Sequence, residues 1–131
     1  MSSYVFYCDQ NTEPECLRRC LVGAPQENAT WAIAIRPGDT LFLYNFQTGD
    51  IVGPLTSVSA VDSYEANAWG GRFPVQVHFA KQEGYRANAN PLRNKLFGSK
   101  SARPKHILED SVAQVISEWL KESGEAIQTG Q

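Results

Sequence analysis

The sequence predicts an α+β domain: a small mixed β-barrel, closed or nearly closed, of five or six strands flanked by two or three helices. Residues 4–8 read YVFYC, an aromatic and β-branched run that is typical of a strand. Residues 73–79 alternate strictly between apolar and other side chains, as in a strand with one buried face. Residues 105–122 repeat their apolar side chains every three or four positions, which indicates an amphipathic helix.

The first helix is predicted just after the first strand. Thr12 and Glu15 have the spacing of a capping box, and Pro14 lies in the first turn. We expect this helix to end near Leu21, since Gly23 and Pro25 follow. Residues 31–35 alternate as WAIAI and predict a short strand or an extended entry segment.

The middle of the chain predicts a hairpin. Residues 40–45 read TLFLYN, a strand that is apolar on both faces, and residues 47–50 form the connection to a strand that begins at Ile51. Residues 92–97 predict a short helix. We expect one domain over residues 1–125 and a frayed tail over residues 126–131.

The composition is that of an ordinary soluble protein. The 131 residues are 42% hydrophobic and 20% charged, and no apolar run approaches the roughly 20 residues of a membrane helix. No basic signal segment precedes Tyr4, and the three cysteines are expected to be reduced. We therefore expect a cytoplasmic protein without a membrane partner; the sequence leaves the oligomeric state open.

The charge is distributed unevenly along the chain. Residues 1–71 contain three arginines and eight acidic residues, whereas residues 72–106 contain eight lysines or arginines and one acidic residue, Glu83. Residues 107–131 contain one lysine and five acidic residues. The basic segment predicts either a surface patch for an anionic partner or charges that pair with the acidic segments across the fold.

Motifs for catalysis are missing from the sequence. Three cysteines and two histidines lack the paired spacing of a zinc site, so we expect no metal. His78 and His106 have no serine or cysteine partner at a recognisable elbow, and there is neither a P-loop nor a dinucleotide-binding glycine motif. We expect a non-catalytic protein without a cofactor.

Aromatic and cationic residues together suggest binding of a planar anionic ligand. Trp69 precedes two glycines and Arg72, so its ring is either a stacking wall for a base or a core residue at the end of the barrel. Trp31 is a second candidate wall. The candidate phosphate-binding residues are Lys81, Arg86, Arg93, Lys95, Lys100, Arg103 and Lys105.

Several segments in the same order resemble the DCD (development and cell death) domain of plant proteins and its small stand-alone archaeal and bacterial relatives. The matching segments are YVFYC at 4–8, ECLRR at 15–19, LVGAP at 21–25, PGDTLFLYNF at 37–46, AW at 68–69 and FPVQVHF at 73–79. The resemblance covers about residues 4–80 and implies a PUA-like fold, related to the EVE, ASCH and YTH domains. The ASCH signature is absent, which disfavours an ASCH-type hydrolase.

The YTH and EVE relatives imply an aromatic pocket for a modified base. By analogy, Trp69 and Trp31 would stack the base, Asp9, Asn11 and Thr12 would lie at its edge, and Arg72 would stand beside it. Our leading hypothesis is an RNA- or nucleotide-binding module that reads a modified base. The alternatives are a protein-interaction adaptor of stress signalling, with a protein partner, and a hydrolase of a modified nucleoside.

Overall fold

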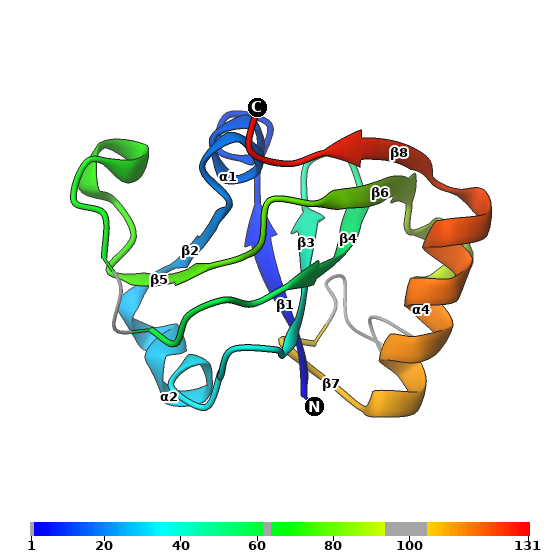
Figure 1. Ribbon diagram of the computed structural model, residues 1–131, viewed down its shortest axis with the longest axis horizontal. Helices are drawn as coiled ribbons and strands as arrows, with labels where there is room; N and C mark the ends of the chain where they lie inside the picture. The colour runs from blue at the N-terminus through cyan, green and yellow to red at the C-terminus, as the bar shows by residue number, and fades with distance from the viewer. Residues whose placement is uncertain (1, 62–63, 94–104) are drawn as a thin grey trace.

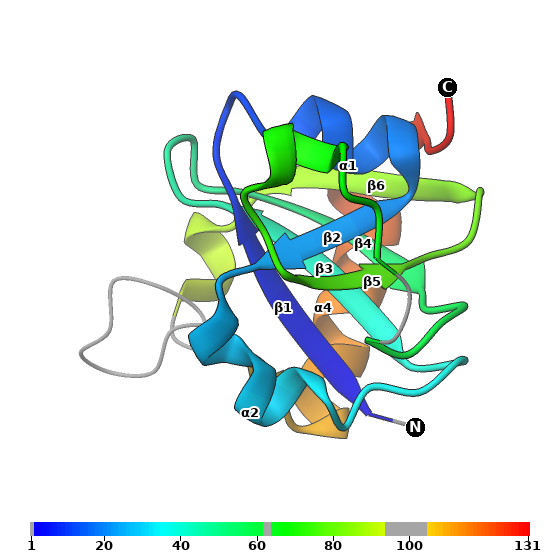
Figure 2. The same ribbon diagram turned by 90° about the vertical axis from the view of Figure 1, so that its left-hand side faces the viewer.

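The computed structural model describes residues 2–61, 64–93 and 105–131, and it has a three-layer α+β architecture. A six-stranded sheet forms the middle layer. The helix α4 (Asp110–Ser123) covers one face, and a two-stranded sheet lies against the other (Figures 1 and 2). Among the described residues, no helix is long and apolar enough to cross a membrane.

The six-stranded sheet is mixed, in the order β7-β1-β3-β4-β6-β8. Its only parallel pair among the described strands is β1 with β3, in which Phe6 lies opposite Leu43. The strands are β1 (Ser3–Cys8), β3 (Thr40–Asn45), β4 (Asp50–Thr56), β6 (Glu83–Asn88), β7 (Ile107–Leu108) and β8 (Glu125–Gln128).

The second sheet pairs β2 (Leu21–Ala24) with β5 (Val75–His78) in antiparallel register. A bridge between Ser57 and Phe79 connects it to the end of β4. The remaining elements are α1 (Glu13–Arg19), η1 (Gln26–Asn28), α2 (Ala29–Ala32), η2 (Ala68–Gly71) and η3 (Asn90–Leu92).

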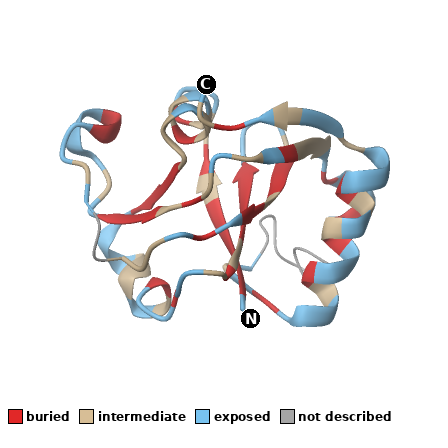
Figure 3. Cartoon of the chain, viewed as in Figure 1, coloured by how far each residue is buried: buried red, intermediate tan, exposed pale blue. Residues whose placement is uncertain are grey.

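The central strands are apolar on both faces because each face meets a different core. In β1, Phe6 packs toward the two-stranded sheet, while Val5 packs toward α4. In β3, Leu43 and Phe42 divide in the same way. The central strands therefore consist mostly of buried residues (Figure 3). Because both faces are covered, residues 40–45 do not show the period of two.

The barrel expected from the sequence is not closed. The six-stranded sheet ends in β7 on one side and β8 on the other, and β2 and β5 form a separate sheet. The α+β class with a mixed sheet is confirmed, together with three α-helices among the described residues. Among the described strands, β7 pairs only with β1, at two positions, so the sheet keeps an edge there.

Two local predictions differ from the structure, and a third lies mostly outside the described residues. The Thr12 side chain makes no cap hydrogen bond to α1. The Glu15 carboxylate, expected to complete the capping box, accepts a hydrogen bond from the backbone N–H of Trp69 at 2.8 Å. Residues 31–35 do not form a strand, because Trp31 lies in α2. The predicted helix at 92–97 falls mostly outside the described residues; Leu92 ends η3.

The C-terminal segment is ordered in place of the expected frayed tail. Residues 125–128 form β8 against β6, and Thr129 is fully buried. The Thr129 hydroxyl lies 3.1 Å from the carbonyl oxygen of Ala80 and 3.0 Å from that of Gln82, and accepts from the Gln82 N–H at 2.8 Å. These bonds fix the end of the chain to the segment between β5 and β6.

Candidate functional site

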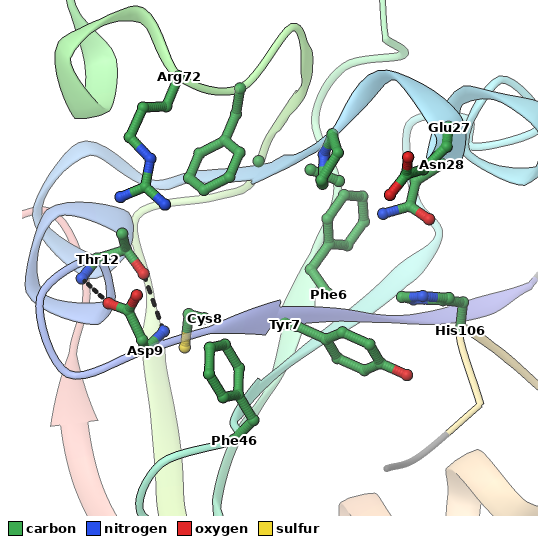
Figure 4. Close-up of a pocket in the computed structure, with 14 residues that line it drawn as sticks. Phe6, Tyr7, Cys8, Asp9, Thr12, Glu27, Asn28, Phe46, Arg72 and His106 are labelled. Atoms are coloured by element: carbon green, nitrogen blue, oxygen red, sulfur yellow. Dashed lines mark hydrogen bonds between the residues drawn. The ribbon is translucent and has the colours of Figure 1, made fainter.

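A pocket of about 300 Å³ lies beside the C-terminal half of β1. It is bounded by β1, the end of β2 with η1, and the segment that follows η2 (Figure 4). The lining residues are Phe6, Tyr7, Cys8, Asp9, Thr12, Gly23, Ala24, Pro25, Glu27, Asn28, Phe46, Arg72, Phe73 and His106. Its volume is near the lower end of the range for small-molecule sites, so it suits one small planar ligand.

Aromatic side chains from four separate segments form the walls. Phe6 and Tyr7 come from β1, Phe46 follows β3, Phe73 follows η2, and His106 precedes β7. Phe6 is fully buried, whereas Phe46 is 40% exposed. Phe46 therefore offers ring surface at the pocket mouth, while Phe6 forms its closely packed base, and such aromatic walls suit a flat aromatic ligand.

Asp9 and Thr12 form a rigid polar turn at one end of the pocket. The Asp9 carboxylate accepts hydrogen bonds from the backbone N–H groups of Asn11 and Thr12, each at 2.8 Å, and Thr12 Oγ1 accepts from the Asp9 N–H at 2.9 Å. Burial opposes ionisation, but the N–H groups of Thr12 and Asn11 and the charge of Arg72 outweigh it and hold the pKa of Asp9 below its ordinary 3.8. Asp9 is therefore an ionised acceptor at neutral pH.

The opposite end of the pocket is built on stacked rings. His106 lies 4.5 Å from Trp31, centroid to centroid at an interplanar angle of 18°, and 4.3 Å from Tyr7. Its Nδ1 is 2.9 Å from the backbone oxygen of Val5. Trp31 Nε1–H donates to Asn28 Oδ1 at 3.3 Å. Trp31 therefore lies behind the lining residues and supports two of them, Asn28 and His106.

Trp69 is buried rather than presented to the pocket. Its side chain is 6% exposed, its ring meets Phe73 edge-on at 5.1 Å, and its Nε1–H donates to the Thr12 carbonyl oxygen at 3.4 Å. A Cβ on Gly23 would lie only 2.6 Å from a carbon of the Trp69 ring and 2.9 Å from Phe73 Cβ. The absent side chain of Gly23 thus lets the indole pack directly behind the pocket lining.

The loop that carries Arg72 has an unusual backbone. Trp69, Gly70 and Gly71 have φ values of +50°, +65° and +84°, a left-handed run that only glycine adopts without strain. Glu15 holds this loop through its bond to the Trp69 N–H. That bond, followed by the pair with Arg19 at 2.8 Å, lowers the pKa of Glu15 below its ordinary 4.5.

A buried glutamine fastens the other side of the same loop. Gln76 is fully buried; its Oε1 accepts from the Glu65 N–H at 2.6 Å, and its Nε2 donates to the carbonyl oxygens of Glu65 at 3.1 Å and Phe73 at 2.9 Å. The Glu65 carboxylate also contacts His78 at 2.8 Å and Arg19 at 3.3 Å. Residues 65–73 are therefore held against both α1 and β5.

The predicted binding residues separate into distinct places. Asp9, Thr12 and Arg72 line the pocket together, whereas Asn11 is exposed and contributes only its backbone N–H to the turn. Trp31 and Trp69 lie behind the lining. The alternation of residues 73–79 identified Phe73 as apolar but not as a wall, and no local signal identified Asn28, Phe46 or His106.

The predicted phosphate-binding residues do not form one described cluster. Arg86 pairs with Glu13 at 3.4 Å, and Lys81 packs its side chain against Gly130. Arg93 and Lys105 are exposed, and Lys105 is adjacent in sequence to His106 of the pocket. Lys95, Lys100 and Arg103 lie outside the described residues. Among the described cations of residues 72–106, Arg72 is the one that lines the pocket.

The pocket also contains the Cys8 thiol, which is 3% exposed. Burial, aided by the neighbouring Cys16 and acidic side chains, raises the pKa of Cys8 far above its ordinary value, so the group remains a neutral thiol. Among the residues that the structure describes, no three His, Cys, Asp or Glu side chains are arranged to hold a metal ion.

Residues 2–118 match the development and cell death domain family. The chain belongs to the DCD domain family. Related plant proteins include the B2 protein of Daucus carota, 34% identical over 85 residues that cover 59% of this DCD chain and 41% of that protein. The DCD domain-containing proteins NRP-B of Glycine max and NRP of Arabidopsis thaliana show the same identity over 59% of the chain, and 26% and 24% of their own lengths.

This DCD chain therefore spans between about a quarter and two fifths of the length of these relatives. The relatives named are plant proteins, so the expected archaeal or bacterial type has no support among them.

Solved YTH domains share the fold of this DCD domain. A YTH domain-containing protein mmi1 in complex with RNA has a TM-score of 0.72 at 11% identity, over 93% of this chain and 82% of that one. The Pho92 YTH domain in complex with m6A has a TM-score of 0.68 at 11% identity, over 97% of this chain and 88% of that one. At this identity the likeness shows a YTH-like fold alone.

Proposed function

We propose that this DCD domain is a non-catalytic RNA- or nucleotide-binding module that holds one base in the pocket beside β1. The observation that carries the proposal is the make-up of that pocket, in which aromatic side chains surround a space with hydrogen-bonding groups at both ends. Base-on-ring stacking contributes about 1–3 kcal/mol per base, and polar groups at the edge then give selectivity.

The charged groups at the Asp9 end suit a nucleotide. An ionised Asp9 accepts hydrogen bonds from donor groups of the ligand, such as a ribose hydroxyl, because it cannot donate. Arg72 is exposed beside it, and a guanidinium binds phosphate oxygens with two parallel N–H bonds. Trp69 and Trp31 support the walls in this proposal, while Phe46, Tyr7 and Phe73 supply the ring surface.

The finer form of the proposal is that the base carries a methyl group on its exocyclic nitrogen. The Pho92 YTH domain of the same fold is in complex with m6A. In this chain the neutral Cys8 thiol and the Phe6 ring line the interior of the pocket, and both accept a methyl group without leaving a polar atom unpaired. Paired RNAs with and without the methyl group would measure this preference.

The experiment is a tryptophan-fluorescence titration with a short single-stranded RNA at several salt concentrations. Phe46→Ala removes an exposed ring at the pocket mouth and should weaken binding about tenfold. Arg72→Ala should weaken binding and reduce the salt slope by about 0.7, the value for one phosphate contact on a single strand. Arg72→Lys should keep the slope while losing the paired hydrogen bonds.

Val115→Ala provides the matched control for the Phe46 variant. Val115 is 38% exposed on α4, on the opposite face of the sheet, so its truncation removes exposed apolar surface away from the pocket. RNA affinity equal to that of the unaltered protein is expected for this control. Binding that is insensitive to Phe46→Ala and Arg72→Ala would refute the pocket as the RNA site, and the absence of any RNA or nucleotide binding would refute the function.

A further inference from the structure

The orientation of the Asn28 side chain is determined by Trp31. The indole Nε1–H can only donate, so the Asn28 atom 3.3 Å away must be the amide oxygen. Asn28 makes no side-chain cap bond to α2, and its NH₂ group donates to no described residue. Asn28 therefore presents two N–H donors at a pocket that it lines.

The tautomer of neutral His106 is determined in the same way. Its Nδ1 lies 2.9 Å from the carbonyl oxygen of Val5, which can only accept, so Nδ1 carries the hydrogen. Nε2 is then a hydrogen-bond acceptor, and no described residue donates a hydrogen bond to it. Because Trp31 and Tyr7 lie against the ring, with centroid separations of 4.5 Å and 4.3 Å, the ring plane is restrained as well.

These two groups lie at the same end of the pocket, away from Asp9 and Arg72 (Figure 4). We propose that Asn28 and His106 together read one edge of the bound base, an edge that places a hydrogen-bond acceptor beside an N–H donor. The inference rests on the proposed function and adds a second group of hydrogen-bonding side chains that recognise the ligand. Trp31 is a positioning residue for both groups, through one hydrogen bond and one ring contact.

The ligand class follows from the donor and acceptor pattern. The Asn28 NH₂ requires an acceptor on the ligand, and His106 Nε2 requires a donor. Adenine has this pattern, since its exocyclic amino group lies beside a ring nitrogen on either edge. Phosphate and carboxylate groups present acceptors alone, and Glu27 at the same end adds a negative charge against them.

The test measures the affinities of four nucleotides: adenosine monophosphate and its analogues that lack the amino group, N1 or N7. Removing one neutral hydrogen bond weakens binding roughly three- to tenfold. The unaltered protein should discriminate by this factor against the analogue without the amino group and against one of the two deaza analogues. The deaza analogue that is rejected identifies the edge in contact.

His106→Phe keeps a stacked ring and removes Nε2, so it should bind the nucleotides with and without the amino group equally. Asn28→Asp keeps the acceptor for Trp31 and replaces the NH₂ group, so it should lose the discrimination between deaza analogues. Trp31→Phe keeps a ring beside His106 but frees the Asn28 amide to turn, which should reduce the same discrimination. A purely structural role for Trp31 would weaken all four nucleotides alike.

If His106→Phe fails to fold, His106→Gln places an amide oxygen near the position of Nε2 and should retain the preference for the amino group. Unchanged discrimination in both Asn28→Asp and His106→Phe, with adenosine monophosphate still bound, would overturn the inference and leave the proposed function intact. Failure of the unaltered protein to bind any RNA or nucleotide would overturn both.

Discussion

Replacing Trp69 by alanine should destabilise the domain, because the structure places this ring in the core. The indole is 6% exposed and packs on the bare backbone of Gly23 and the edge of Phe73. Truncation of a buried tryptophan to alanine costs about 3–5 kcal/mol. That loss is a large part of the 5–15 kcal/mol that typically stabilises a domain of this kind, and it should lower the Tm by roughly 10–20 °C.

Urea denaturation followed by far-UV circular dichroism measures the loss directly. The comparison variant is Trp119→Ala, which removes a half-buried indole from α4 on the other side of the sheet. We expect Trp119→Ala to be less destabilising and to leave RNA binding unchanged. A loss below about 1 kcal/mol for Trp69→Ala, together with abolished RNA binding, would show that Trp69 is a stacking wall and would refute the burial argument.

Three further predictions concern the neighbours of this ring. Gly23→Ala places a Cβ within 2.6 Å of the indole and should lower the free energy of unfolding by about 1–3 kcal/mol, as measured by thermal denaturation. The control is Gly84→Ala, whose added Cβ would have its nearest neighbour at 3.4 Å and which should be less destabilising. The ionised Glu15 carboxylate stabilises the folded state at pH values above 4.5, and this contribution is lost as the pH falls through its lower pKa in the folded protein. In an acid titration, Glu15→Gln should therefore lose less stability with falling pH than the unaltered protein. Identical acid profiles of the two proteins would refute the assignment. Arg72→Ala should leave the Tm within about 2 °C, since Arg72 is exposed, and a larger fall would show that it supports the fold.

The central strands were predictable because their residue types leave few alternatives. The β1 run and the two-sided strand β3 fall within a residue of their expected bounds. The strand β2 was not predicted, because Leu17 and Leu21 have helical spacing and the chain passes from α1 into β2 through one residue, Cys20, at φ +55°. Tertiary pairing with β5 overrides the local pattern there.

Residues 31–35 and the C-terminal segment show two other limits. Alternating tryptophan, isoleucine and alanine fits both periods, since alanine is tolerated on either face of a helix or a strand. The polar end of the chain has no local signal for order, because Thr129 is fixed by the carbonyl oxygens of Ala80 and Gln82, more than 40 residues earlier. Hydrogen bonds between residues so far apart in the sequence cannot be predicted from a short stretch of sequence.

The pocket could be predicted only in part for a related reason. Asp9 and Thr12 follow a clear strand, so their position at a strand end was accessible from the sequence. The other end is formed by Asn28 and His106, which are 78 positions apart and are brought together by the ring of Trp31. The burial of Trp69 depends on Gly23 in a strand that was not expected, so its role as a core residue was one of two open interpretations.

The most direct test of a base-binding pocket beside β1 is a ¹H–¹⁵N correlation titration with a short single-stranded RNA. We expect the largest shifts of backbone amides at Tyr7, Asp9, Ala24 and Phe73, which surround the pocket, and small shifts along α4. Shifts concentrated on α4 or on β8, with the four pocket amides unmoved at saturation, would contradict the account.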